Sequence, residues 1–113
     1  MKLNCFADCH SHTNFSFDAK DTVDAMCASA VERGLSALAI TDHCDYDNVI
    51  EGLYAPYYAE DIYRAVSAAE EKYDGKLILL HGIELGEGHL YSNQARGLIE
   101  KYDYDIVLGS LHN

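Results

Sequence analysis

Basic residues are scarce in this sequence, and the scarcity limits the partners that the protein can have. Only 8 of the 113 residues are Lys or Arg, against 19 Asp and Glu, and the formal net charge is -11. A groove for nucleic acid needs Lys and Arg to neutralise the phosphate backbone, so we expect no nucleic-acid partner. An anionic small molecule is not excluded, because bound divalent cations can reverse the charge of a site locally.

Long hydrophobic runs and cysteine pairs are also lacking. No apolar stretch approaches the roughly 20 residues of a membrane span. The N-terminus, MKLNCFADCHSH, turns polar too early for a signal peptide. We therefore expect a cytoplasmic protein without a membrane partner. The four cysteines form no Cys-x-x-Cys pair. Buried reduced thiols are the expected state, and a metal role for Cys9 and Cys44, which adjoin histidines, stays open.

Apolar runs alternate with helical patterns, which predicts a single α/β domain with a parallel sheet and right-handed crossovers. The expected strands are 3–7, 35–41, 76–84 and 104–112, the expected helices are 22–34, 59–73 and 93–102, and a polar loop is expected at 42–58. In the first helix apolar residues recur at helical spacing, with Thr22 as the N-cap and Gly34 as the stop.

Side chains that can bind metals stand at the ends of all four expected strands. They are His10, His12, Asp42, His43, Glu84 and His112. The carboxyl ends of parallel strands share one edge of a sheet, where ligands bind. His10 and His12 are two residues apart, so on an extended chain both imidazoles point the same way. Such nitrogens suit Zn, Fe and Mn, and the two oxygens of Glu84 fit a position between two ions.

This series of strand ends predicts a metal site that a single residue would not predict. One histidine at a strand end is usually hydrogen-bonded, and Glu84 alone would be an ordinary surface or capping group. A hydroxide held between two metal ions becomes a nucleophile at neutral pH. The pattern therefore predicts a metal site that can activate a water molecule.

Four motifs resemble those of the polymerase and histidinol phosphatase (PHP) family. The segment DCHSHTNFSFD resembles the first motif, Asp-x-His-x-His-Thr-x-x-Ser, while ITDHCD, GIELGE and DIVLGSLHN resemble the second, third and fourth. The four occur in order over the whole chain, and in series they are highly specific. The resemblance implies a distorted seven-stranded β/α barrel, similar to a TIM barrel, with a trinuclear metal site. Residues 1–113 would form its N-terminal half, about four βα units, as one partial domain.

The resemblance implies six metal ligands, which are His10, His12, Asp18, His43, Glu84 and His112. The two histidines of the first motif would bind one ion with Glu84. Glu84 would bridge it to a second ion bound by His112. Asp18, where many members have a histidine, would bind a third ion with His43.

Four other polar residues lie in or beside these motifs. Asp8 and Asp42 are expected to orient imidazoles, because a ligating histidine usually donates its other N–H to a carboxylate or carbonyl. A direct ligand role for Asp42 stays open. His89, in the loop after the third motif, is a candidate substrate contact. His81 is expected to be packed or hydrogen-bonded.

Within the family, NFSFDAK, GIELGEGH and YDIVLGSLHN look most like the stand-alone histidinol-phosphate phosphatases of histidine biosynthesis. That implies hydrolysis of L-histidinol phosphate by a hydroxide that Glu84 helps to hold between two or three Zn, Mn or Fe ions. A nucleic-acid phosphoesterase or exonuclease module and an inactive metal-binding remnant are the alternatives. An amidohydrolase would need a bridging lysine at a later strand end, where neither Lys76 nor Lys101 lies.

The family pattern continues beyond Asn113, with a further histidine and a late Asp-x-His pair. We therefore expect the chain to be the N-terminal half of a longer protein, nearly inactive by itself. The strand at 104–112 would leave an unpaired edge. That edge predicts self-association or a complementing C-terminal half.

Overall fold

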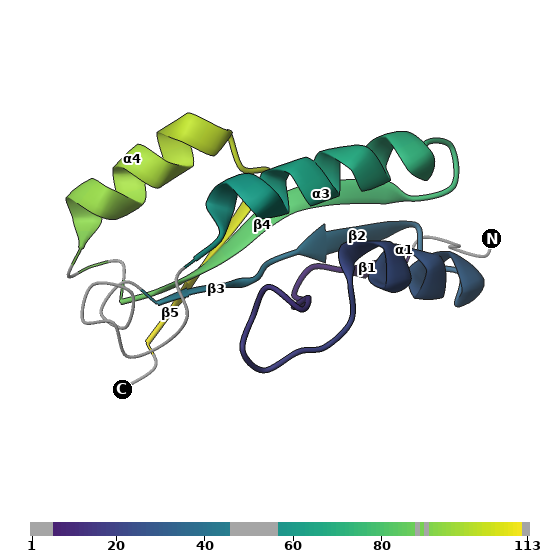
Figure 1. Ribbon diagram of the computed structural model, residues 1–113, viewed down its shortest axis with the longest axis horizontal. Helices are drawn as coiled ribbons and strands as arrows, with labels where there is room; N and C mark the ends of the chain where they lie inside the picture. Colours follow the sequence, from purple (N-terminus) through teal and green to yellow (C-terminus); the bar gives the residue numbers. More distant parts are fainter. Residues whose placement is uncertain (1–5, 46–56, 88, 90, 112–113) are drawn as a thin grey trace.

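The computed structural model describes residues 6–45, 57–87, 89 and 91–111, which form a parallel sheet with helices packed on it (Figure 1). The elements in chain order are β1 (Ala7–Asp8), α1 (Val23–Glu32), β2 (Ala37–Ile40), β3 (His43–Asp45), α3 (Ala59–Lys72), β4 (Ile78–Gly86), α4 (Ser92–Tyr102) and β5 (Ile106–Ser110). The predicted alternation of strands and helices in an α/β fold is confirmed.

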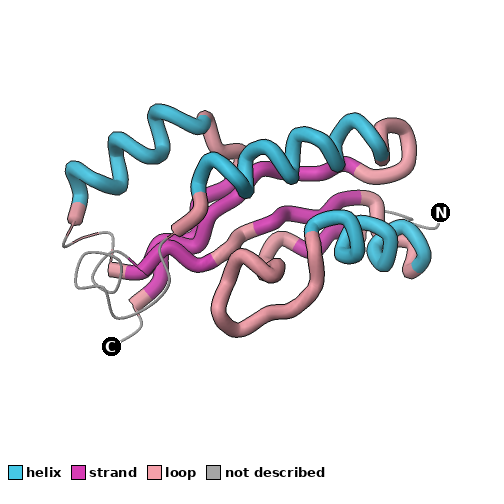
Figure 2. The backbone as a smooth tube through the Cα atoms, in the orientation of Figure 1, coloured by secondary structure: helices cyan, strands magenta, loops and turns pink. Residues whose placement is uncertain are grey.

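Every strand pair in the sheet is parallel. β1 pairs with β2, and β4 pairs with β2, β3 and β5. Ile40 pairs with His81 and His43 pairs with Glu84, both across 41 residues of sequence. β3 therefore continues the line of β2 along one edge of β4, and β5 occupies the other edge. The tube in Figure 2 shows these strands running together, with α3 and α4 above them in this view.

β3 corrects the expectation of a loop over 42–58. His43–Asp45 pairs with Glu84–Gly86 of β4. Three polar or small residues carry no hydrophobic alternation that would predict a strand. Here the pairing with a long neighbouring strand supplies what local sequence does not. The rest of the expected loop falls partly on 46–56, which lie outside the described residues.

The helices bury their apolar faces on one side of the sheet. The first core cluster contains Val23, Cys27, Ala30, Leu38, Ile40, Ile62, Val66, Ala69, Tyr73, Leu77 and Leu79. The second, beneath α4, contains Cys44, Ile83, Leu85 and Ala95. Odd-numbered residues of β4 enter these clusters, so its even-numbered residues, Glu84 among them, face the opposite side. In Figure 1, α3 and α4 lie along the same side of β4.

The predicted ends and inner face of α1 are confirmed. The Thr22 side chain accepts a hydrogen bond from the Ala25 N–H at 3.1 Å. Gly34 has φ +80, the left-handed conformation that a glycine adopts readily after a helix. Cys27 is fully buried on the inner face of the helix and Cys44 is buried as well, as expected, whereas Cys9 is exposed.

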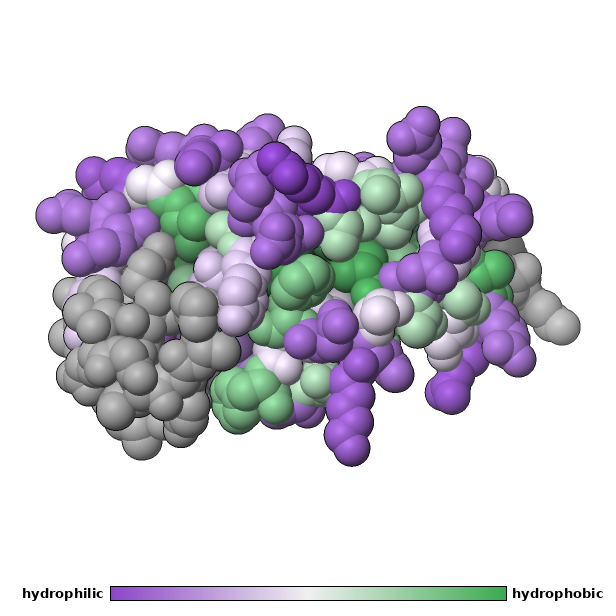
Figure 3. Space-filling model, in the orientation of Figure 1, coloured by the Kyte–Doolittle hydropathy of each residue, from purple (hydrophilic) through white to green (hydrophobic). Residues whose placement is uncertain are grey.

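The surface mixes polar and apolar side chains. On the face shown in Figure 3, hydrophilic residues cover the outside of α4 and the far end of α3, and hydrophobic residues gather between the elements. Within the described part of the chain, no helix combines the length and the hydrophobicity that crossing a membrane requires.

Candidate metal centre

The segment that follows β1 sends alternate side chains to opposite sides. Ser11 and Thr13 are buried, and Ser11 forms hydrogen bonds with β2 and the residue after it through its backbone and its hydroxyl. His10 and His12 point the other way, toward Glu84. The predicted common direction of the two histidines is confirmed. It results from an extended backbone whose other side is hydrogen-bonded to the sheet.

Glu84 forms the floor of the site. Only 2% of it is exposed, and its two oxygens meet different histidines. Oε1 contacts Nε2 of His10 and lies 3.3 Å from Nε2 of His12, while Oε2 lies 2.9 Å from Nδ1 of His43. A carboxylate that bridges two ions needs two oxygens directed at two sets of ligands, and Glu84 has this arrangement.

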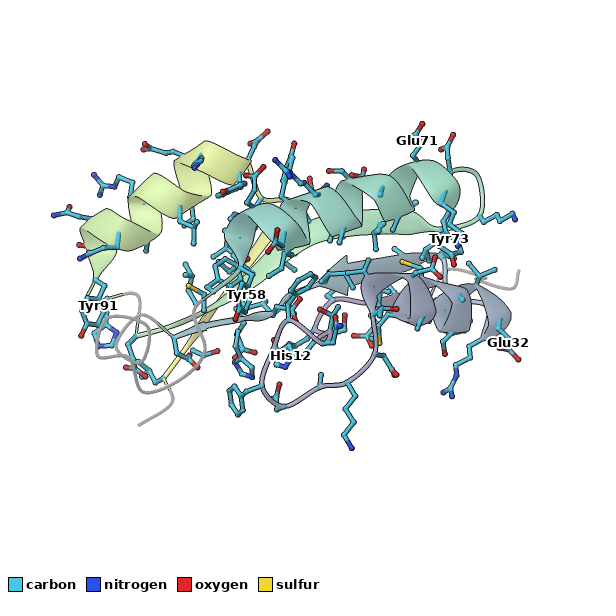
Figure 4. The ribbon with its side chains drawn as sticks, in the orientation of Figure 1. His12, Glu32, Tyr58, Glu71, Tyr73 and Tyr91 are labelled. Atoms are coloured by element: carbon cyan, nitrogen blue, oxygen red, sulfur yellow. The ribbon has the colours of Figure 1, made fainter. Side chains whose placement is uncertain are left out.

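Asp18 closes the cluster on the solvent side. Its Oδ1 lies 3.3 Å from Nδ1 of His12, and its Oδ2 lies 2.9 Å from Nε2 of His43. The Asp18 side chain is 41% exposed and that of His10 is 57% exposed, against 3% for Glu84. The site therefore runs from a buried carboxylate to an open mouth. Figure 4 shows His12 in this group, on the side of the sheet away from α3 and α4.

Two sets of side chains could each hold a metal ion, with donor atoms within 4.8 Å of one another. We call His10, His12 and Glu84 the first set. We call His12, Asp18 and His43 the second set. Imidazole nitrogen and carboxylate oxygen are donors that Zn, Mn and Fe accept, so the residues present fit the ions that the sequence implied.

The electrostatics of the cluster keep both carboxylates ready to bind a cation. Burial by itself would raise the pKa of Glu84, but the hydrogen bond with His10 and the charges of His43 and His12 lower it overall. Burial acts the same way on Asp18, and the hydrogen bond with His43 and the nearby imidazole charges lower its pKa as well. Both side chains are therefore ionised at neutral pH.

Asp8 and Asp42 make hydrogen bonds that differ from those expected of them. Asp8 accepts from the backbone N–H of His10 at 3.1 Å. Asp42 is fully buried, and its described hydrogen bonds are with Thr13 and Ser16. Each of these two carboxylates accepts from backbone N–H or hydroxyl groups, where a contact with an imidazole was expected. Both oxygens of Asp42 are engaged in this way, which also argues against its role as a direct ligand.

His81 and His89 make their described contacts away from the cluster. His81 faces α3, with Nε2 2.6 Å from Oε1 of Glu70, so the expected hydrogen-bonded role is confirmed. His89 is exposed and lines a groove between α4 and β5. His112 lies outside the described residues.

Sequence reasoning missed two buried acidic residues, one beside His43 and one three residues after Glu84. Asp45 is 8% exposed, with Oδ2 3.8 Å from Nδ1 of His43. Glu87 is 1% exposed and has φ 59, a left-handed backbone that is uncommon for a residue other than glycine. Asp45 lies two residues after His43 on the same strand, which was the signal that could have found it. We see no comparable signal for Glu87.

Comparison with known proteins supports this arrangement of motifs. Residues 8–113 match the family model described as PHP domain. The chain is 30% identical over 109 residues to a protein named "Probable histidinol-phosphatase" from Clostridium acetobutylicum, and 25% identical over 107 residues to a histidinol-phosphatase from Lactococcus lactis subsp. lactis. Each match covers 93% of this chain and 38% of the relative, so the chain spans well under half the length of these curated relatives.

A solved structure shares the fold. It is the crystal structure of histidinol phosphate phosphatase from Lactococcus lactis subsp. lactis complexed with zinc, L-histidinol and phosphate. The TM-score is 0.81 at 20% identity, over 96% of this chain and 40% of that one. The likeness shows that this chain has the α/β fold of the matching part of that protein.

Proposed function

The chain belongs to the PHP domain family, and on that premise we propose that it is part of a metal-dependent phosphatase that hydrolyses L-histidinol phosphate to L-histidinol and phosphate, in histidine biosynthesis. The names of the relatives support the substrate. The geometry supports the reaction class. The single observation that carries the proposal is the contact of one buried carboxylate, Glu84, with imidazoles from two separate segments.

Each member of the cluster has a proposed task. His10 and His12 would hold one ion together with Glu84, and Asp18 and His43 would hold another. His112 is a further proposed ligand, for an ion that Glu84 would also bind. In all, two or three ions of Zn, Mn or Fe would be held. When bound, such ions lower the pKa of water and neutralise charge on a phosphoryl group. Asp18 and His10, at the exposed mouth, lie where a substrate would arrive, and His89 is a proposed substrate contact.

The chain's own charge favours a small substrate over nucleic acid. A net charge of -11 repels a polyanionic backbone at long range, whereas a single phosphate needs only the local positive charge of bound ions. A nucleic-acid phosphoesterase of the same family is the second candidate, and the shared motifs are the observation that favours it.

Phosphate release from L-histidinol phosphate tests the proposal. The full-length protein, purified and incubated in turn with Zn, Mn and Fe(II), should release phosphate, and Glu84→Gln should abolish the release. His81→Ala is the matched control, because this histidine faces α3 on the other side of the sheet. A protein that releases no phosphate from this substrate with any of the three metals, yet degrades single-stranded DNA or RNA, would establish the second candidate instead.

A further inference from the structure

Asp42 lies beneath the loop that carries half of the cluster. Its side chain has no exposed surface. Its Oδ1 accepts from the Thr13 N–H at 2.6 Å and from the Ser16 hydroxyl at 2.7 Å, and its Oδ2 accepts from the Thr13 hydroxyl at 2.8 Å. Thr13 is fully buried and Ser16 is 5% exposed. Three donors on a carboxylate in a dry environment make a strong and specific attachment.

Ser16 extends this attachment to the neighbouring strand. Its hydroxyl donates to Asp42 and accepts from the backbone N–H of His43 at 3.0 Å. One hydroxyl thus joins the loop, the end of β2 and the start of β3. Because the N–H belongs to His43 itself, the hydrogen bond acts directly on the backbone that carries this imidazole.

The attached turn determines where the second set lies. Ser16 N–H donates to the Thr13 carbonyl at 2.9 Å, which makes a tight turn directly after His12. Two residues beyond Ser16, the Asp18 carboxylate meets both His12 and His43. Each member of the second set therefore lies within two residues of Thr13, Ser16 or Asp42.

We propose that Asp42 is a positioning residue for the second set, acting through Thr13 and Ser16 rather than by contact with an imidazole or an ion. This inference rests on the proposed function, because it concerns metal binding by the same cluster. On this proposal, the buried Asp42 carboxylate sets the distance between β3 and the loop that follows β1. The hydrogen bonds that join Asp42 to Thr13 and Ser16 form a network that we call the Asp42 latch.

His12 belongs to both sets, but the segment that carries it is attached to β2 by other hydrogen bonds, so effects on Asp18 and His43 can be tested separately. Ser11, between His10 and His12, is attached to the Ala39 carbonyl at 2.6 Å and to the Thr41 hydroxyl at 3.0 Å. Glu84 is fixed within β4. Weakening the Asp42 latch should loosen Asp18 and His43 and leave the first set in place.

Cobalt(II) titration of the full protein separates the two sets, since the visible absorption of bound cobalt reports the ligand geometry. Ser16→Ala removes the hydroxyl that joins Asp42 to His43. Thr13→Val removes one donor to Asp42, together with the acceptor of the Phe15 N–H, with little change in shape. We expect each to weaken one cobalt equivalent by about ten- to hundredfold and to alter its absorption, while the other equivalent is unchanged. Thr13→Ser, which keeps the hydroxyl, should restore normal binding.

Val66→Ala serves as the control for lost stability, because Val66 lies in the core between α3 and the sheet, away from the cluster. The proposal is overturned if Ser16→Ala and Thr13→Val bind both equivalents as the unmodified protein does. It is also overturned if Val66→Ala weakens the same equivalent to the same extent, because the loss would then follow general destabilisation.

Hydrogen exchange of the His43 amide gives a readout that needs no metal. Ser16→Ala removes the acceptor of this N–H, so its exchange should become faster than in Val66→Ala. If the unmodified protein binds no cobalt, the proposed function fails, and the exchange rate alone then decides whether the Asp42 latch holds β3. Unchanged exchange in Ser16→Ala would refute the latch whatever the metal result.

Discussion

His43 and Glu84 are direct partners on neighbouring parallel strands, and their side chains meet, with Nδ1 of the histidine 2.9 Å from Oε2 of the carboxylate. The short strand β3 exists through its pairing with β4, and this pairing places an imidazole beside a carboxylate 41 residues away in sequence. Sheet formation and assembly of the candidate metal centre are therefore one event.

A double variant tests the first set. His10→Ala with His12→Ala removes both imidazoles that contact Oε1 of Glu84. We expect metal binding to weaken by more than about a hundredfold, because losing even a supporting partner of a ligand costs 10- to 100-fold. Elemental analysis of protein purified without chelator measures the effect. Metal content equal to that of the unmodified protein would show that the first set is misassigned.

Gly82 is required by close packing, and Gly97 is not. A Cβ at position 82 would lie 2.6 Å from Cγ2 of Thr41 and 2.8 Å from Cγ2 of Ile106. Gly82→Ala should therefore lower the free energy of unfolding by about 1–3 kcal/mol. Nothing lies within 4 Å of a Cβ at position 97, inside α4, so Gly97→Ala should raise it by about 0.5–1 kcal/mol. Urea unfolding compares the two, and equal effects would contradict the packing argument.

The Cys27 thiol should make stability fall in alkaline solution. Burial raises the pKa of this thiol from 9.0 to about 11, and the charge of Asp24 acts in the same direction. Below pH 9 the thiol is neutral in the folded and the unfolded chain, so its contribution to the free energy of unfolding is fully present. Between about pH 9 and about pH 11 the unfolded chain ionises first, so about 2–3 kcal/mol is lost.

Comparison with Cys27→Ala isolates this contribution from other groups that titrate at high pH. The variant should be less stable at neutral pH but should lose less stability over the alkaline window. Parallel curves for the two proteins would show that the buried thiol has an ordinary pKa.

The 113-residue chain should associate with itself. Among the described residues β5 pairs with β4 alone. Val107 on β5 is 40% exposed, and Leu111, directly after β5, is 74% exposed. A groove of about 610 Å³ between α4 and β5 adds apolar surface. Exposed strand edges of this kind pair with other chains. Sedimentation should show association that rises with concentration and that Val107→Lys reduces. A monomer at all concentrations would contradict the prediction.

Local sequence was enough to predict the elements whose causes are local. α1 begins at a capping hydroxyl, Thr22, carries an apolar stripe and stops before Gly34, and each of these signals is visible within the segment. β3 could not be predicted in the same way, because its stability comes from a partner strand distant in sequence. The same holds for Asp42, whose donors lie more than 25 residues before it.

By itself the sequence determined the types of side chain at the strand ends, their order along the chain and the parity that sends His10 and His12 in one direction. Tertiary structure decided which groups meet. His81 and Glu84 are three residues apart on one strand, so they face opposite sides, one toward Glu70 on α3 and the other toward the cluster. Tertiary structure also decided that Asp42 binds the loop after β1 and not an imidazole. A buried carboxylate must accept hydrogen bonds from nearby donors, and folding placed Thr13 and Ser16 next to it.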